Sequence, residues 1–144
     1  MRIEMYENIQ KNKNNIFYSV SVEQLKEQED KIGIIFPELF RKFLLEIGYG
    51  FLETKNGNIN RIMDPKSIAE FRNKDGQFSN SQDIEIYNEF DNDKLVFFES
   101  NETAYFSIGF SKENNGQIFY YDKKIANNLQ EFLLNYSKDE RYFE

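Results

Sequence analysis

The chain has 144 residues, the length of one ordinary domain, and 17% of them are aromatic, which supplies large side chains for a core. It contains no histidine and no cysteine, so Ser-His-Asp and Cys-His catalytic arrangements, disulfides and thiolate metal ligands are excluded. With 18 basic and 25 acidic residues the formal net charge is −7, and no direct binding to nucleic acid is expected, because its phosphates would be repelled.

No segment of the sequence has the length and apolar character of a membrane span, and the first 15 residues lack the apolar core of a secretory signal. A cytoplasmic protein without membrane contact is therefore expected. The sequence also lacks internal repeats and Pro-rich or Ser-rich linkers. We expect one domain over residues 1–144, with an oligomeric state that the sequence leaves open.

Two amphipathic helices are predicted first. Ser21, followed three residues later by Gln24, is typical of a capping box that opens a helix. Pro37 is expected at the first position of a second helix, since its φ is already helical, and Gly48 is expected to end that helix in a left-handed conformation. The first helix is expected to bury Val22, Leu25 and Ile32, and the second Leu39, Phe40, Phe43, Leu44 and Ile47.

In the middle of the chain, the residue pattern predicts a strand at 57–63. A short helix is predicted to follow, with Asp64 as its cap, Pro65 as its first residue and Phe71 at its end. A polar mobile loop is predicted for 72–83. Three strands are then predicted at 94–99, 103–110 and 116–122, where β-branched and aromatic residues recur at the spacing of a meander.

Towards the end of the chain, Asn115-Gly116 predicts a turn, and the spacing of the apolar residues that follow predicts a final amphipathic helix. That helix is expected to carry a stripe made of Ile125, Leu129, Phe132, Leu133 and Tyr136. N-terminal helices, an antiparallel β-meander and a C-terminal helix packed on the sheet together make an α+β fold.

The segment SVEQLKEQEDKIGIIFPELFRKFLLEIGYGFL (21–52) resembles the opening signature of the SUKH superfamily of the Smi/Knr type. LVFFESNETAYFSIGF (95–110) and GQIFYYDKKIANNLQEFLLNY (116–136) resemble the strands and final helix of that family. The likeness covers roughly residues 20–136 in element order. Tyr49 departs from the family pattern, standing where members often have another small residue, and the insertion at 83–93 has no matching pattern.

This resemblance implies an immunity protein that binds and neutralises a cognate polymorphic toxin, with neither catalysis nor a cofactor. An intracellular scaffold or regulator that binds an endogenous protein is the main alternative, since other members have such roles. An enzyme using paired carboxylates is a more distant alternative.

The acidic segment DIEIYNEFDND (83–93) is the candidate partner-binding site. Within 83–102 there are seven acidic side chains and one basic one, so this region could steer a basic, nuclease-type toxin toward the protein. A solvated acidic loop that serves only solubility is the plainer interpretation. The candidate residues are Asp83, Glu85, Tyr87, Glu89, Asp91 and Asp93, with Tyr87 as an aromatic anchor and Phe90 as a further candidate that could equally be core.

No metal site is expected in this segment. Asp91 and Asp93 resemble the start of a calcium loop, but Val96 stands where such a loop requires glycine. We therefore predict that a chelator changes neither the melting temperature nor toxin inhibition. Thermal unfolding with and without EDTA tests this, and a lowered melting temperature restored by one particular metal would contradict it.

Overall fold

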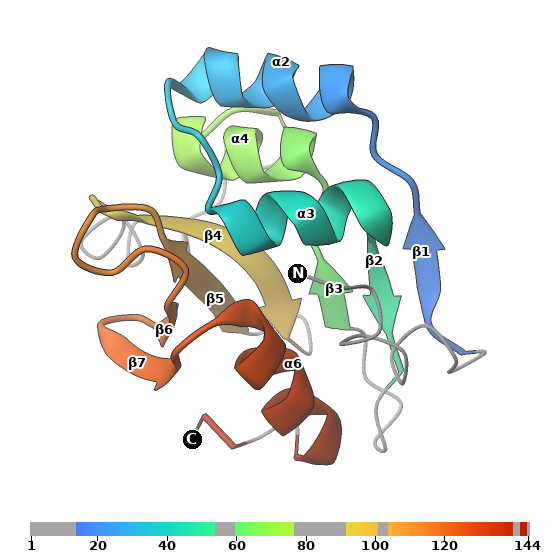
Figure 1. Cartoon of the computed structure of the whole chain (residues 1–144), viewed down its shortest axis with the longest axis vertical. Helices are drawn as coiled ribbons and strands as arrows, with labels where there is room; N and C mark the ends of the chain where they lie inside the picture. The colour runs from blue at the N-terminus through green and yellow to red at the C-terminus, as the bar shows by residue number, and fades with distance from the viewer. Residues whose placement is uncertain (1–13, 54–59, 77–91, 101–103, 140–141, 144) are drawn as a thin grey trace.

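The computed structural model describes residues 14–53, 60–76, 92–100, 104–139 and 142–143 (Figure 1). Within this part of the chain the strands form one seven-stranded sheet in the order β1 to β7, and each strand is antiparallel to its neighbours. The predicted α+β meander is confirmed. The elements are β1 Ile16–Tyr18, α2 Val22–Ile32, α3 Glu38–Glu46, β2 Tyr49–Leu52, β3 Asn60–Ile62, α4 Pro65–Asn73, β4 Lys94–Ser100, β5 Ala104–Gly109, β6 Ile118–Tyr120, β7 Lys123–Ala126 and α6 Leu129–Lys138.

Helix α2 begins with the predicted capping box. The Ser21 hydroxyl accepts from the Gln24 amide at 3.1 Å, and Gln24 Oε1 accepts from the Ser21 amide at 2.9 Å. Leu25 is fully buried, but Val22 is 54% exposed, so its predicted place in the core is wrong. The buried residues of α2 are Leu25 and Glu29, and Val22 lies outside this buried face.

Helix α3 begins one residue later than predicted, with Pro37 as its N-cap. The proline ring sets φ at −53°, but ψ is 142°, so the residue is extended rather than helical. Phe40, Phe43 and Leu44 are fully buried as predicted. The helix ends before Gly48, whose φ of 114° is accessible mainly to glycine.

The predictions for the middle of the chain are largely confirmed. Asp64 caps α4, which reaches Asn73, so Arg72 and Asn73 are helical and not part of the predicted loop. Of the strand predicted at 57–63, Asn60–Ile62 forms β3 and Met63 lies beyond its end, whereas residues 57–59 and 77–83 lie outside the described residues. The three predicted meander strands are present as β4, β5 and β6.

Strands β1, β2 and β7 were not predicted. Ile125 lies in β7, so its predicted place in the last helix is wrong. The helix α6 begins only at Leu129, because the Asn128 side chain accepts from the Glu131 amide at 2.8 Å and caps it there. Ile125 is nevertheless buried, so the apolar pattern was right about burial and wrong about conformation.

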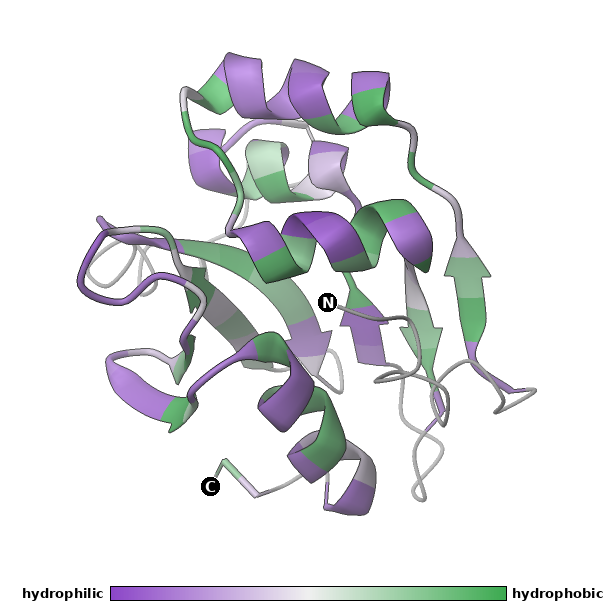
Figure 2. Ribbon diagram, in the orientation of Figure 1, coloured by the Kyte–Doolittle hydropathy of each residue, from purple (hydrophilic) through white to green (hydrophobic). Residues whose placement is uncertain are grey.

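Helices α3 and α6 pack on the same face of the sheet. The ring of Phe97 in β4 lies 5.2 Å from Phe40 of α3 and 5.9 Å from Phe132 of α6, between ring centroids. Phe98 and Phe106 also contact Phe132. In Figure 2 most of β4 is hydrophobic whereas α2 is mostly hydrophilic, as expected for a central strand and a peripheral helix.

Helix α4 reaches the other face of the sheet. Its Phe71 ring lies 5.0 Å from that of Tyr105, between centroids. Because successive side chains of a strand point to opposite faces, Tyr105 and its neighbour Phe106 serve the two faces of β5. The sheet is therefore packed on both sides near its centre.

Phe43 and Phe132 are both 0% exposed, so truncating either to alanine should lower the free energy of unfolding by about 3–5 kcal/mol. Denaturant titration measures this loss. Leu134→Ala on α6 is the matched control, because Leu134 is 50% exposed and should lose far less. A loss below about 1 kcal/mol for both phenylalanine variants would contradict the predicted energetic role of this packing.

Candidate partner-binding surface

Most of the predicted acidic site lies outside the described residues. This applies to Asp83, Glu85, Tyr87, Glu89 and Asp91, whose roles stay predictions. Asp93 is described and stands immediately before β4. The surface that can be built from the structure therefore starts at Asp93.

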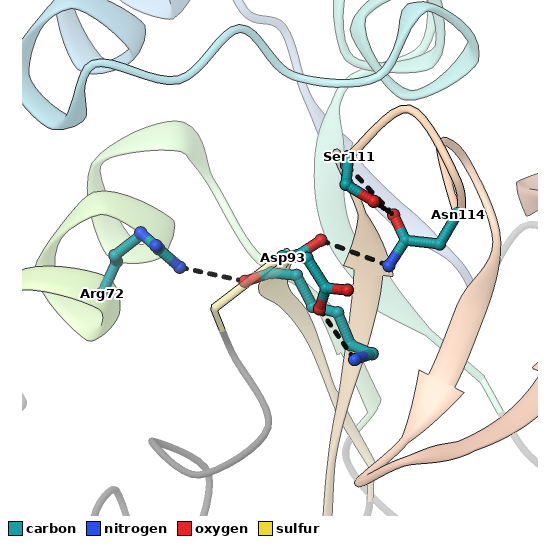
Figure 3. Close-up of polar contacts among 5 residues, drawn as sticks. Arg72, Asp93, Ser111 and Asn114 are labelled. Carbon is teal, nitrogen blue, oxygen red and sulfur yellow. Dashed lines mark hydrogen bonds and ion pairs between the residues drawn. The ribbon is translucent and has the colours of Figure 1, made fainter.

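The backbone of Asp93 is anchored while its carboxylate stays accessible. Its carbonyl oxygen accepts from the Phe110 amide at 2.9 Å. It also accepts from Asn114 Nδ2 at 3.4 Å (Figure 3). The side chain is 46% exposed and its Oδ1 lies 2.8 Å from Lys94 Nζ. Although the Lys94 side chain is only 12% exposed, the Asp93 carboxylate keeps enough access to solvent to meet a partner.

The loop that follows β5 is tied to this corner through Asn114, which is almost fully buried. Its Oδ1 accepts from the Ser111 amide at 3.0 Å and from the Ser111 hydroxyl at 2.7 Å. A Cβ added at Gly109 would overlap Asn114, so only glycine allows this close approach. On the other side, Arg72 Nη1 donates to the Lys94 carbonyl at 3.0 Å (Figure 3).

An open groove of about 840 Å³ lies next to this corner, between the α2–α3 connection and the loop after β5. Phe110 belongs to both features, since its amide donates to Asp93 and its side chain lines the groove. The Arg72 guanidinium lies 5.2 Å from the centroid of the Phe110 ring. The groove is lined by Gly33, Ile34, Ile35, Phe36, Pro37, Glu38, Arg41, Lys42, Leu45, Phe110 and Asn115.

One wall of the groove is held by Glu29, which is only 5% exposed. Its carboxylate receives Arg41 Nε at 2.8 Å, Arg41 Nη2 at 2.9 Å and the Phe36 amide at 2.8 Å. The hydrogen bond to Glu29 raises the pKa of Arg41 above its ordinary value, and an arginine is charged even without such a shift. The bidentate pair fixes the direction in which α3 leaves the connection.

The arrangement offers hydrogen bonds, charge and apolar contact. Among the described residues, no three acidic, histidine or cysteine side chains lie close enough to hold a metal ion. Within the same part of the chain, no helix is long and apolar enough to cross a membrane.

The sequence matches the model described as the SMI1 / KNR4 family (SUKH-1) over residues 19–135. The chain belongs to this family. It is also 42% identical over 138 residues to the immunity protein YxxD of Bacillus subtilis (strain 168), which covers 96% of this chain and 94% of that protein. The resemblance seen in the opening signature is thereby confirmed.

Two features of this SUKH-1 chain were missed in the sequence. Glu29 was not singled out in the sequence, since nothing in the helical pattern distinguishes a carboxylate that faces an arginine in the next helix. Ile35 is 75% exposed beside the groove although it belongs to an apolar run. Both depend on how the α2–α3 connection folds, which local periodicity does not encode.

Glu29→Ala should lower the free energy of unfolding by about 3 kcal/mol, the lower end of the range for breaking a buried ion pair, because Arg41 keeps some access to water. Urea denaturation measures this change. Lys42→Ala is the control, since its pair with Glu38 is exposed and should contribute less than about 1 kcal/mol. Equal losses in the two variants would show that the buried pair does not organise α2 and α3.

Proposed function

We propose that this protein is an immunity protein, which neutralises a toxin by binding it stoichiometrically and without catalysis. The observation that carries the proposal is the 42% identity, over 96% of the chain, to a protein named as an immunity protein. Membership of the SUKH-1 family supports it. The lack of histidine and cysteine is consistent with a role in binding, because the commonest general base and the thiol nucleophile are both missing.

We further propose that the toxin domain is basic, as a nuclease must be to hold nucleic acid. The net charge of −7 and the seven acidic residues within 83–102 support this partner. The exposed carboxylate of Asp93 also supports it, because the backbone beneath it is anchored to the Phe110 amide and the Asn114 side chain. A charge on a fixed backbone loses little conformational freedom on binding.

The proposal is tested by expressing the toxin domain encoded beside this gene, with and without this protein. Survival only in the presence of this protein, together with a one-to-one complex of the purified pair, is the expected result. Matched expression of a destabilised variant, Phe132→Ala, controls for the burden of making a second protein. If the wild type neither protects nor binds, the alternative of a scaffold with an endogenous partner replaces this proposal.

Charge reversal in the acidic segment should slow association with this toxin domain. We expect Asp91→Lys and Asp93→Lys to reduce the association rate severalfold at low salt, and the effect to shrink above roughly 0.1 M salt, where the Debye length is about 10 Å. Tyr87→Ala should instead speed dissociation and cost about 2 kcal/mol or more of binding free energy. Stopped-flow or surface-based kinetics at two salt concentrations measures these rates.

Asp30→Lys is the control for this experiment. It makes the same change of charge at an exposed position of α2, outside the acidic segment. A smaller effect than that of the two segment variants is expected. Wild-type rates in all three segment variants would place the interface elsewhere on the protein.

A further inference from the structure

We propose that the toxin is anchored on an aromatic patch formed by β1 and β2, and that the part of the toxin seated there carries lysine or arginine side chains. This proposal rests on the proposed immunity function and names a surface for it. The β1–β2 patch consists of Ile16, Tyr18, Tyr49 and Phe51.

The register of the two strands places these four side chains together. Ile16 pairs with Phe51 and Tyr18 pairs with Tyr49. Paired residues lie on the same face, and so do residues two apart on one strand. Phe17, between Ile16 and Tyr18, points the other way and packs edge-on against Phe43 of the core, with 6.4 Å between centroids. The patch is therefore on the face opposite to α3.

The patch is open to solvent. Ile16 is 50%, Tyr18 47% and Phe51 37% exposed. Six large hydrophobic residues are exposed in the described part of the chain, and half of them are in this patch. A fourth, Val22, begins α2 shortly after β1 and is 54% exposed. Exposed apolar groups that gather in one place mark interaction surfaces, whereas isolated ones need no explanation.

The patch is also rigid, because two glycines allow the backbones of β1 and β2 to approach each other closely. Gly48 and Gly50 have φ of 114° and 154°, and a Cβ on them would overlap the carbonyl oxygens of Tyr18 and Ile16, respectively. The rings of Tyr18 and Tyr49 stack with centroids 5.4 Å apart. A pre-ordered aromatic pair loses little entropy on binding, and tyrosine is among the residues most enriched in binding hot spots.

The chemistry around the patch selects a basic partner. Glu53 follows β2 in the same alternation as Tyr49 and Phe51, and it is exposed. Arg61 on the neighbouring strand β3 pairs with Phe51, and Glu99, 3.7 Å from its Nε, balances its charge. Within the described residues that buried Nε donates no hydrogen bond. Tyrosine ring faces attract lysine and arginine. Carboxylate and exposed ring faces therefore favour a cationic side chain on the partner.

A hollow of about 410 Å³ adjoins Tyr49, between α2 and the start of α4. Its lining is balanced in charge, with two acidic residues, Glu27 and Asp64, and two basic ones, Lys31 and Lys66. Gln28 also lines it, and its buried Oε1 receives no hydrogen bond from any residue that the structure describes. Such an acceptor costs free energy until a donor reaches it. A lysine or arginine entering from the patch would supply that donor.

The β1–β2 patch is separate from the Asp93 corner. In the sheet order, β2 and β3 lie between β1 and β4, and Figure 1 shows β1 at the opposite side of the molecule from β6 and β7. The effects of substitutions at the two places on toxin binding can therefore be measured independently. An acidic segment that speeds approach and an aromatic surface that slows release are compatible roles for one complex.

The test measures binding of the toxin domain encoded beside this gene to Tyr18→Ala and Phe51→Ala. We expect the dissociation constant to rise about tenfold or more in each, mainly through faster dissociation, with the melting temperature close to that of the wild type. Tyr18→Phe should keep most of the affinity because it keeps the ring. Leu134→Ala and Ile35→Ala, which remove exposed apolar side chains elsewhere, should bind within about twofold of the wild type.

The outcomes separate this inference from the proposed function. If the wild type binds and protects, and both patch variants do the same with unchanged rates, the inference is overturned and the immunity function stands. If the wild type binds no toxin, both are overturned. If the patch variants change only self-association, as seen by sedimentation without toxin, a second copy occupies the patch and the inference is again overturned.

Discussion

The arrangement of α2 and α3 depends on one buried carboxylate. Glu29 accepts two hydrogen bonds from Arg41 and one from the Phe36 amide, so a single side chain joins α2, the connection after it and α3. A carboxylate that is only 5% exposed would be costly without these partners. Because α3 carries Phe40 and Phe43 into the core, the position of this helix on the sheet is coupled to the position of α2.

Local chemistry in the sequence was sufficient to predict the starts of α2 and α4 and the central strands. The Ser21 capping box, the Asp64 cap and the aromatic runs of β4 to β6 each act within a few residues, and each is found in the structure. The strands that were missed are short. β1 and β7 have three and four residues, and β2 contains a glycine. Their strand conformation comes from their neighbours, which local propensity does not register.

The candidate surfaces also differ in whether the sequence alone could predict them. Composition was enough to single out the acidic segment that ends at Asp93, because charge is a property of residues alone. The groove beside Phe110 and the β1–β2 patch could not be predicted, since they depend on which side chains the strand register and the α2–α3 connection leave outside. Tyr18 and Phe17 are neighbours in an apolar run, yet only Phe17 packs into the core.

The way β1 is attached also bears on how the family can diversify. Close approach of the backbones at Gly48 and Gly50, together with the inward ring of Phe17, holds the strand in place. The outward side chains of Ile16, Tyr18 and Phe51 are 37–50% exposed, so substitutions there should cost the fold less than substitution of Phe17. Under selection to bind a changing partner, the side chains at these positions could thus be substituted one at a time while the fold is retained.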